Sequence, residues 1–311
     1  MPNTRACDQV GSTQAQLIGD EVQSATDYIR RRGGCLHAAT PNGHSGPMTM
    51  PRPLRVAFVG KGGSGKSTIS GTFARLLARR GERVLALDSD PLPGMAYALG
   101  VDVDDGPIPD DVVIEGPEGG ARWVLDPTLD VESVIERHAA LCPDGVRYLQ
   151  FGNTWGHIST LQRAQHAWSQ VVRDVDPDHW HLVGDLPGGT RQAMFGWAKY
   201  ADTVCVVVEP TTKSLHAAER LLNLAEATWA PQHLVIVANK VVDAAEVRGI
   251  EVRLGRPVGV DLARDTDVSI ADREACAPLD AASDGEFARG VDALIDLVAG
   301  LDYGDRQEGA S

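Results

Sequence analysis

One stretch of this sequence has the residue types and the spacing that phosphate binding requires. The run Gly60-Lys61-Gly62-Gly63-Ser64-Gly65-Lys66-Ser67-Thr68 fits G-x-x-x-x-G-K-[ST] and lies between a predicted strand and a predicted helix. Glycines let such a loop wrap closely, with backbone N–H groups directed at phosphate oxygens. Lys66 would then reach the β- and γ-phosphates, and the Ser67 hydroxyl would bind Mg²⁺. We therefore expect a nucleotide site here; the alternative is a glycine-rich turn that binds nothing.

Acidic residues follow two further predicted strands. Asp88 and Asp90 come directly after the strand predicted at 83–87, and Asp185 ends the apolar run that begins at His181. The chain then continues through Gly188 and Gly189. Because ligands of open parallel sheets bind at the carboxyl ends of the strands, we expect these carboxylates beside the phosphate loop. Aspartates are also common turn formers, so each position has a purely structural alternative.

The elements that must position these residues can be predicted from the apolar pattern. From Leu54 onward short apolar runs alternate with helical stretches, which predicts an α/β fold: a mainly parallel sheet with helices on both faces. The predicted strands are 55–59, 83–87, 181–184, 203–208, 234–238 and 257–260. Helices are expected at 159–175, after Thr211 and Thr212, and at 286–301, and the segment 106–127 reads as an insertion or long loop.

The composition predicts that the chain has three parts: an extension, a domain and a tail. Residues 1–51 are polar and lack a sustained apolar period, so they predict a disordered extension, with a helical turn or two at 25–32. Residues 52–303 predict the nucleotide-binding domain, and 304–311 a disordered tail. We also expect the natural protein to begin at Met48 or Met50, just upstream of the first strand; a regulatory arm is the alternative.

Charge and cysteine usage exclude several classes of protein. The formal net charge is −14, which makes DNA binding or attachment to anionic lipid unlikely on electrostatic grounds. The five cysteines include no CxxC or CxC pair, so a reducing cytoplasm is the predicted location. No apolar stretch approaches the ~18 residues that span a bilayer, so membrane insertion is not expected. His179 and His181 lack a third ligand at metal-like spacing, which favours packing roles for both.

The lysine at position 61 gives the phosphate loop a family resemblance. The general motif leaves this position free, whereas the loop here resembles the deviant P-loop of the MinD/ParA superfamily of ATPases. In that superfamily the early lysine crosses a dimer interface and touches the nucleotide of the other subunit. The resemblance extends over roughly 54–301, and it implies ATP, Mg²⁺ and an ATP-dependent homodimer.

The resemblance also implies roles for the other candidate residues. Asp88-Ser89-Asp90-Pro91 looks like switch I, in which Asp90 orients or deprotonates the attacking water and Asp88 supports the magnesium shell. Asp185 looks like the Walker B residue that holds a magnesium-bound water, and the N–H of Gly188 or Gly189 would sense the γ-phosphate. Asn239 stands where the superfamily recognises the base. A guanine reader would need an acid at position 242, where this chain has Val242, so adenine is favoured.

Within the superfamily, two runs look most like the nickel-insertion ATPases of carbon monoxide dehydrogenase maturation. These are Val207-Val208-Glu209-Pro210-Thr211 and Ala86-Leu87-Asp88-Ser89-Asp90-Pro91. The CxC pair of those metallochaperones is missing, and so is the cluster cysteine that nitrogenase-type reductases carry after switch II. The last predicted helix is acidic, unlike the basic membrane helix of MinD-type proteins. The sequence thus predicts an ATP-hydrolysing dimeric switch that acts on an unidentified protein partner. The rivals are a positioning or scaffold protein with ATP as a timer, and a P-loop small-molecule kinase or synthetase.

Overall fold

The computed structural model describes residues 50, 52–90, 93–104, 112–117, 122–150, 158–189, 198–228 and 231–303. Apart from Met50, the predicted extension over 1–51, with its helical turn at 25–32, lies outside these residues, as does the predicted tail. Met50 is 8% exposed, packs in the main core and donates its N–H to Glu82 at 3.4 Å. The packed part of the chain therefore includes a residue that precedes the predicted boundary at 52.

Buried strands form the centre of the fold. In chain order the strands of the main sheet are β1 (Arg55–Gly60), β2 (Val84–Asp88), β5 (Ala140–Leu141), β6 (Arg147–Gln150), β7 (His181–Asp185), β8 (Thr203–Val208), β9 (His233–Val241) and β10 (Val260–Ala263). Among the described residues they lie in the order β10-β9-β8-β1-β7-β2-β6-β5. All neighbouring pairs are parallel except β5 with β6. This confirms the predicted α/β class with a mainly parallel sheet.

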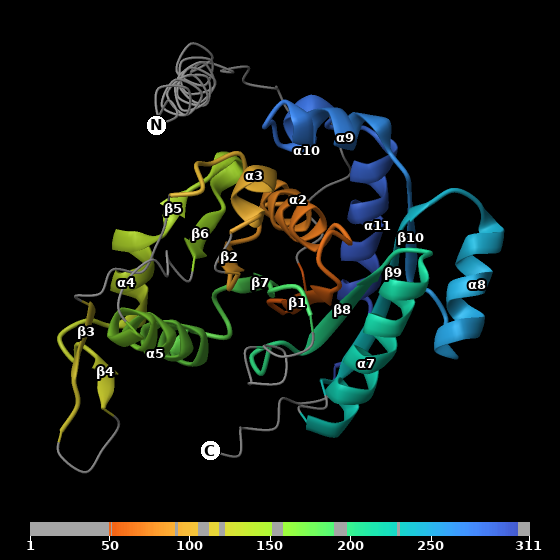
Figure 1. The fold of residues 1–311 in the computed structure, drawn as a ribbon. Coiled ribbons are helices and arrows are strands. Elements are labelled where there is room, and N and C mark those ends of the chain that lie inside the picture. The colour runs from red at the N-terminus through yellow and green to blue at the C-terminus, as the bar shows by residue number, and fades with distance from the viewer. Residues whose placement is uncertain are drawn as a thin grey trace, which may run out of the picture. The chain divides into compact units, whose positions relative to one another are not determined.

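Helices cover both faces of this sheet (Figure 1). They are α2 (Lys66–Arg79), α3 (Met95–Leu99), α4 (Val131–His138), α5 (Ile158–Asp174), α7 (Thr212–Thr228), α8 (Ala244–Leu254), α9 (Thr266–Arg273), α10 (Pro278–Ala281) and α11 (Glu286–Ala299). Side chains alternate between the faces of a strand, so Val56 and Phe58 pack with α2, α3 and α11, whereas Ala57 and Val59 pack with α7 and α8. On that second face, β2 and β7 pack against α4 and α5. The phosphate loop thus leaves a strand that is buried on both faces.

Some elements differ from their predictions. The strand predicted at 257–260 is β10, which starts at Val260, and β9 continues past its predicted end to Val241. Strands β5 and β6 were not predicted. In the segment predicted as a loop, β3 (Val113–Glu115) pairs antiparallel with β4 (Trp123–Leu125) as a separate two-stranded sheet. Helices α5, α7 and α11 lie within a few residues of their predicted positions.

Candidate functional site

The phosphate loop has a backbone that only glycine adopts without strain or collision at several positions. Gly63 and Gly65 lie in the left-handed region, with φ of 82° and 97°. A Cβ on Gly60 would stand 2.5 Å from the Val207 carbonyl oxygen, and one on Gly65 would stand 2.2 Å from Nδ2 of Asn239. The loop is therefore packed tightly between the ends of β8 and β9.

The two lysines of the loop occupy different environments. Lys66 is 6% exposed and is the first residue of α2, where the positive end of the helix dipole favours an anion. Lys61 is half-buried, and among the described residues its ammonium donates to the neighbouring Gly62 carbonyl alone, at 3.2 Å. Ser64 is buried and donates its N–H to the Lys61 carbonyl at 3.1 Å, which closes the loop. Lys66 is thus a buried cation at the start of α2 whose charge acts on Asp185, while Lys61 is partly exposed.

Two predicted carboxylates are brought together by strand pairing. Asp88 at the end of β2 is the register partner of Asp185 at the end of β7, and both are buried. The oxygens of Asp88 are occupied: Oδ1 accepts the Asp90 N–H at 2.9 Å, and Oδ2 accepts the Met95 N–H at 3.0 Å and the Tyr148 hydroxyl at 3.4 Å. Within the part of the chain that the structure describes, neither oxygen of Asp185 has a hydrogen-bond partner of normal geometry. Of the two carboxylates, Asp185 is therefore the one whose oxygens can bind a cation.

Burial dominates the electrostatics of this pair. Removal from water raises the pKa of Asp185 to about 6. The Lys66 ammonium and the nearby Ser67 hydroxyl oppose this shift, although neither makes a hydrogen bond of normal geometry to the carboxylate. Burial and the charge of Asp185 also raise the pKa of Asp88 well above its ordinary value. A buried carboxylate without a donor is costly unless a cation pairs with it, so the residues present fit Mg²⁺, which prefers oxygen ligands.

The segment after Asp88 is held against the phosphate loop. Asp90 is half-buried, and the following Pro91 and Leu92 lie outside the described residues. Where the chain resumes, a Cβ on Gly94 would stand 2.9 Å from the Ser67 hydroxyl oxygen. The chain just beyond the predicted switch I thus lies close to Ser67, a residue expected to bind magnesium.

The predicted switch II glycines touch the same loop through their backbone. A Cβ on Gly188 would stand 2.9 Å from Cα of Gly62, so this contact requires glycine. Gly189 has φ of 112° and donates its N–H to the Gly60 carbonyl at 3.2 Å. That N–H is one of the two groups expected to sense a γ-phosphate, and here it is bonded to the loop itself.

Asn239 lies inside β9 rather than after its end. It is 5% exposed and donates its side-chain N–H to the Ser64 carbonyl at 2.8 Å, so it contacts the phosphate loop. Val242 is 71% exposed. The carboxylate of Asp243 caps α8 by accepting the N–H groups of Ala245 and Glu246, at 2.8 and 3.0 Å. The nearest acid to position 242 is therefore already used by a helix end.

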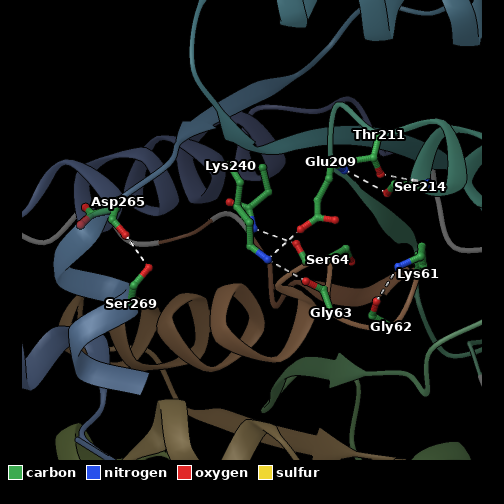
Figure 2. A network of polar contacts seen from close by, with 11 residues as sticks. Lys61, Gly62, Gly63, Ser64, Glu209, Thr211, Ser214, Lys240, Asp265 and Ser269 are labelled. Atoms are coloured by element: carbon green, nitrogen blue, oxygen red, sulfur yellow. Dashed lines mark hydrogen bonds and ion pairs between the residues drawn. The ribbon is translucent and has the colours of Figure 1, made fainter. Parts of the chain in front are cut away.

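Sequence reasoning missed three polar side chains at this edge. Tyr148 reaches Asp88 from β6, a strand too short and too polar in sequence to be predicted. Lys240 and Glu209 form an ion pair beside the loop (Figure 2). Both belong to sequence runs that were noted for other features, and neither side chain was predicted to lie at the site. The signal available for Lys240 was its position directly after Asn239 at the end of an apolar run.

Each histidine of the H-x-H pair lies against a carboxylate, and His181 is the buried one of the two. His181 is buried; its Nδ1 accepts the Leu54 N–H at 3.0 Å and its Nε2 lies 3.0 Å from Glu82. Burial lowers the pKa of His181, consistent with a neutral ring that accepts on one nitrogen and donates on the other. His179 pairs separately with Asp176. In the residues that the structure describes, no group of three or more His, Cys, Asp or Glu side chains could hold a metal ion.

Known proteins resemble this chain over most of its described length. Residues 56–276 match the family model for the CobQ/CobB/MinD/ParA nucleotide binding domain. The carbon monoxide dehydrogenase accessory protein CooC of Rhodospirillum rubrum is 28% identical over 208 residues, which cover 62% of this chain and 77% of that protein.

Solved structures with the same fold belong to related ATPases. A ParA family ATPase from Chlorobium tepidum has a TM-score of 0.61 at 18% identity, with 80% of this chain and 99% of that chain covered. The septum site-determining protein MinD of Pyrococcus horikoshii, complexed with Mg-ADP, has a TM-score of 0.60 at 15% identity, with 80% and 98% covered. At these identities the likeness shows the fold. Among the helices that the structure describes, none has the length and apolar character needed to cross a bilayer.

Proposed function

Because the chain belongs to the CobQ/CobB/MinD/ParA family of nucleotide-binding domains, we propose that it binds ATP with Mg²⁺, hydrolyses it, and acts as a dimeric switch on a protein partner. The observation that carries the proposal is the Asp185 carboxylate, buried without a hydrogen-bond partner beside the loop that bears Lys66 and Ser67. Such a group needs a cation, and the adjoining loop needs an anion. Magnesium triphosphate supplies both.

In this proposal each residue has a defined task. Lys66 neutralises charge on the β- and γ-phosphates, and Ser67 and Asp185 would hold Mg²⁺, which when bound offsets charge on the phosphate oxygens. Asp90 orients the attacking water and accepts its proton. Asp88 supports the site indirectly, since its oxygens hold the N–H groups of Asp90 and Met95 and so position the switch I segment.

Adenine is the base that the surroundings of Asn239 favour. Reading guanine in the NKxD manner needs a free carboxylate near position 242, and two acids close by are already engaged: Asp243 accepts two N–H groups as a helix cap, and Glu246 accepts the Val242 N–H at 2.7 Å. The amide oxygen of Asn239 is a hydrogen-bond acceptor, so it can accept from the adenine amino group. ATP is accordingly the proposed nucleotide.

The switch and its partner rest on the family and on Lys61. An ammonium near the loop rim, bonded only to its own loop, is free to move to the phosphates of a second subunit at little cost. The Rhodospirillum relative is an accessory protein of another enzyme, which supports action on a protein client. We propose the cytoplasm as the location, on the cysteine usage given above.

Two substitutions test the ATPase proposal because they should fail in different ways. Lys66→Ala should abolish ATP binding in calorimetry, whereas Asp90→Ala should bind ATP within a few-fold of wild type yet hydrolyse it about a hundredfold more slowly. Lys199→Ala is the matched control, since Lys199 is exposed and precedes the opposite end of β8. Normal ATP affinity in the Lys66 variant would contradict the assignment of the phosphate loop.

A second measurement separates the switch from a kinase or synthetase. Phosphate release from ATP should occur with Mg²⁺ alone and should not increase when candidate small-molecule acceptors are added. Transfer of the γ-phosphate to an acceptor, with little release to water, would show that the protein is a kinase or synthetase and not a switch.

A further inference from the structure

Two consecutive residues of β9 bond to the same phosphate loop. Successive side chains of a regular strand point to opposite faces, so Asn239 and Lys240 should not reach one loop together. The backbone at Lys240 resolves this: its φ is 58°, in the left-handed region, and β10 skips it by pairing Leu262 with Asn239 and Ala263 with Val241. Lys240 is therefore the extra residue of a β-bulge, a device that re-aims a side chain.

The re-aimed ammonium makes two short contacts (Figure 2). Nζ of Lys240 lies 2.7 Å from the Gly63 carbonyl oxygen and 2.7 Å from Oε1 of Glu209. Glu209 is itself fixed, because its side chain is only 17% exposed and its N–H is donated to the Ser214 hydroxyl at 3.0 Å. The ammonium thus connects the loop to the rigid end of β8.

The backbone conformation indicates that the side chain matters. Left-handed φ is unfavourable for a residue with a Cβ and is tolerated where surrounding contacts impose it, most often near functional sites. Glycine or asparagine would fit this bulge with less strain. What lysine adds is a donor long enough to reach the Gly63 carbonyl.

We propose that Lys240, held by Glu209, is a positioning residue that fixes the first half of the phosphate loop, residues 61–64, before nucleotide binds. This rests on the proposed function for its consequence, because a loop held in place presents its N–H groups to phosphates without an ordering cost. A plain ion pair that joins β8 to β9 is the competing explanation. That explanation gives no role to the bond with Gly63.

Hydrogen exchange of the nucleotide-free protein tests the positioning role without relying on ATP binding. Lys240→Met keeps the stem but removes the donor, and it should speed exchange of the amides of residues 61–66 about tenfold. Lys240→Arg can donate to both partners and should restore exchange to within about threefold of wild type. Unchanged exchange in the Lys240→Met variant would overturn the proposal. So would faster exchange spread equally over β8 and β9, which is what a simple strand connector predicts.

Affinity for a slowly hydrolysed ATP analogue gives the second readout. The dissociation constant should rise about tenfold in Lys240→Met, return toward wild type in Lys240→Arg, and rise less in Glu209→Gln, whose amide oxygen still accepts from the ammonium. Equal losses in Lys240→Met and Lys240→Arg would count against positioning. If wild-type protein bound no ATP, the proposed function would fail, while the exchange result would still decide the role of Lys240.

Discussion

Asp88 and Asp185 show how two identical side chains, side by side in the sheet, acquire different tasks. Their strands are in register, yet Asp88 accepts two backbone N–H groups and the Tyr148 hydroxyl, whereas Asp185 accepts none of normal geometry. A hydrogen-bonded carboxylate organises the chain around it, and an unpartnered buried one is unfavourable until a cation arrives. The free energy lost at Asp185 in folding is therefore recoverable when the site is filled.

At the residue scale, Asp185→Asn should separate stability from function. The amide removes a buried charge, so the melting temperature of the Mg²⁺-free protein should rise; a pKa raised from 3.8 to about 6 corresponds to roughly 3 kcal/mol at most. Affinity for Mg-ATP should fall at least about tenfold because one magnesium ligand becomes a neutral amide. Thermal unfolding and calorimetry measure the two effects. Asp178→Asn, at an exposed position, should change neither.

The same carboxylate predicts a pH dependence of known sign. Its folded-state pKa of about 6 lies above the unfolded value, so the cost of burying the charge is present in full above about pH 6 and fades as pH falls toward 3.8. The stability advantage of Asp185→Asn over wild type, without Mg²⁺, should therefore shrink between pH 7.5 and pH 5. The affinity of the wild-type protein for Mg-ATP should increase as the pH rises from 5 to 7.5. An advantage independent of pH would show that the pKa of Asp185 does not differ between the folded and the unfolded protein.

Residues that act through local chemistry could be named from the sequence, and residues that act through geometry could not. The phosphate loop, Asp88 and Asp185 follow strands whose apolar runs are readable, and the structure brings them to one edge. Lys240 reaches the loop because its φ is positive and because β10 pairs with the residues on either side of it. Neither property can be predicted from the residues adjacent to Lys240 in the sequence. Tyr148 depends on a strand whose residues pair with β2 residues 62 positions earlier in the sequence, so no local pattern reveals it.

At the element scale, the crossing of α2 and α3 fixes how the end of switch I meets the loop. A Cβ on Gly71 would stand 2.6 Å from Cβ of Ala98, so the two helices approach as closely as their backbones permit. Helix α3 starts at Met95, whose N–H binds Asp88. The glycine in α2 thus permits the position of α3, whose first N–H binds Asp88.

The same substitution at two glycines should have opposite effects. Gly71→Ala should destabilise the protein by about 1 to 3 kcal/mol, because α3 must move, and Ala98→Gly in the same chain should recover much of that loss. Gly249→Ala is the control: Gly249 lies exposed inside α8 with nothing near its Cβ position, so alanine should stabilise by about 0.5 to 1 kcal/mol. Denaturant unfolding measures all three. A Gly71→Ala protein as stable as wild type would show that α3 yields without cost.

Elements were predictable where burial shapes the sequence. Strands covered on both faces read as continuous apolar runs, which is why β1, β7 and β8 lie close to their predicted bounds. The run predicted at 257–260 was misplaced because Gly259, which packs against Val235 and Leu297, belongs to the approach to β10 and not to the strand. Strands β3 to β6 are only two to four residues long, so none of them forms a continuous apolar run that the sequence would reveal.

At the scale of the molecule, parallel pairing explains why one edge carries the whole candidate site. Strand β1 lies between β7 and β8, and β2 and β9 flank these, so the residues that end five strands meet at one edge. The loop from β1 contacts the end of β9 through Asn239 and the chain after β7 through Gly188. Lys61 is the loop side chain that these contacts leave near the rim. In the proposed dimer, the second copy would approach the nucleotide from the side on which Lys61 stands.

Dimerisation should accordingly depend on both the triphosphate and Lys61. An ammonium that reaches across an interface is attracted by the partner's γ-phosphate, and with ADP it has much less charge to meet. Light scattering with Mg²⁺ and a slowly hydrolysed ATP analogue should show a dimer for wild type and a monomer for Lys61→Ala; ADP should leave both monomeric.

Because Lys61 bonds only to the Gly62 carbonyl in the described part of the single chain, its loss should leave the melting temperature within a few degrees of wild type. The Lys199→Ala protein, which loses an equal charge elsewhere, should dimerise normally. A wild-type chain that stays monomeric with the analogue, or a Lys61→Ala chain that pairs as well as wild type, would remove the dimeric switch from the proposed function while leaving ATP binding through Lys66 intact.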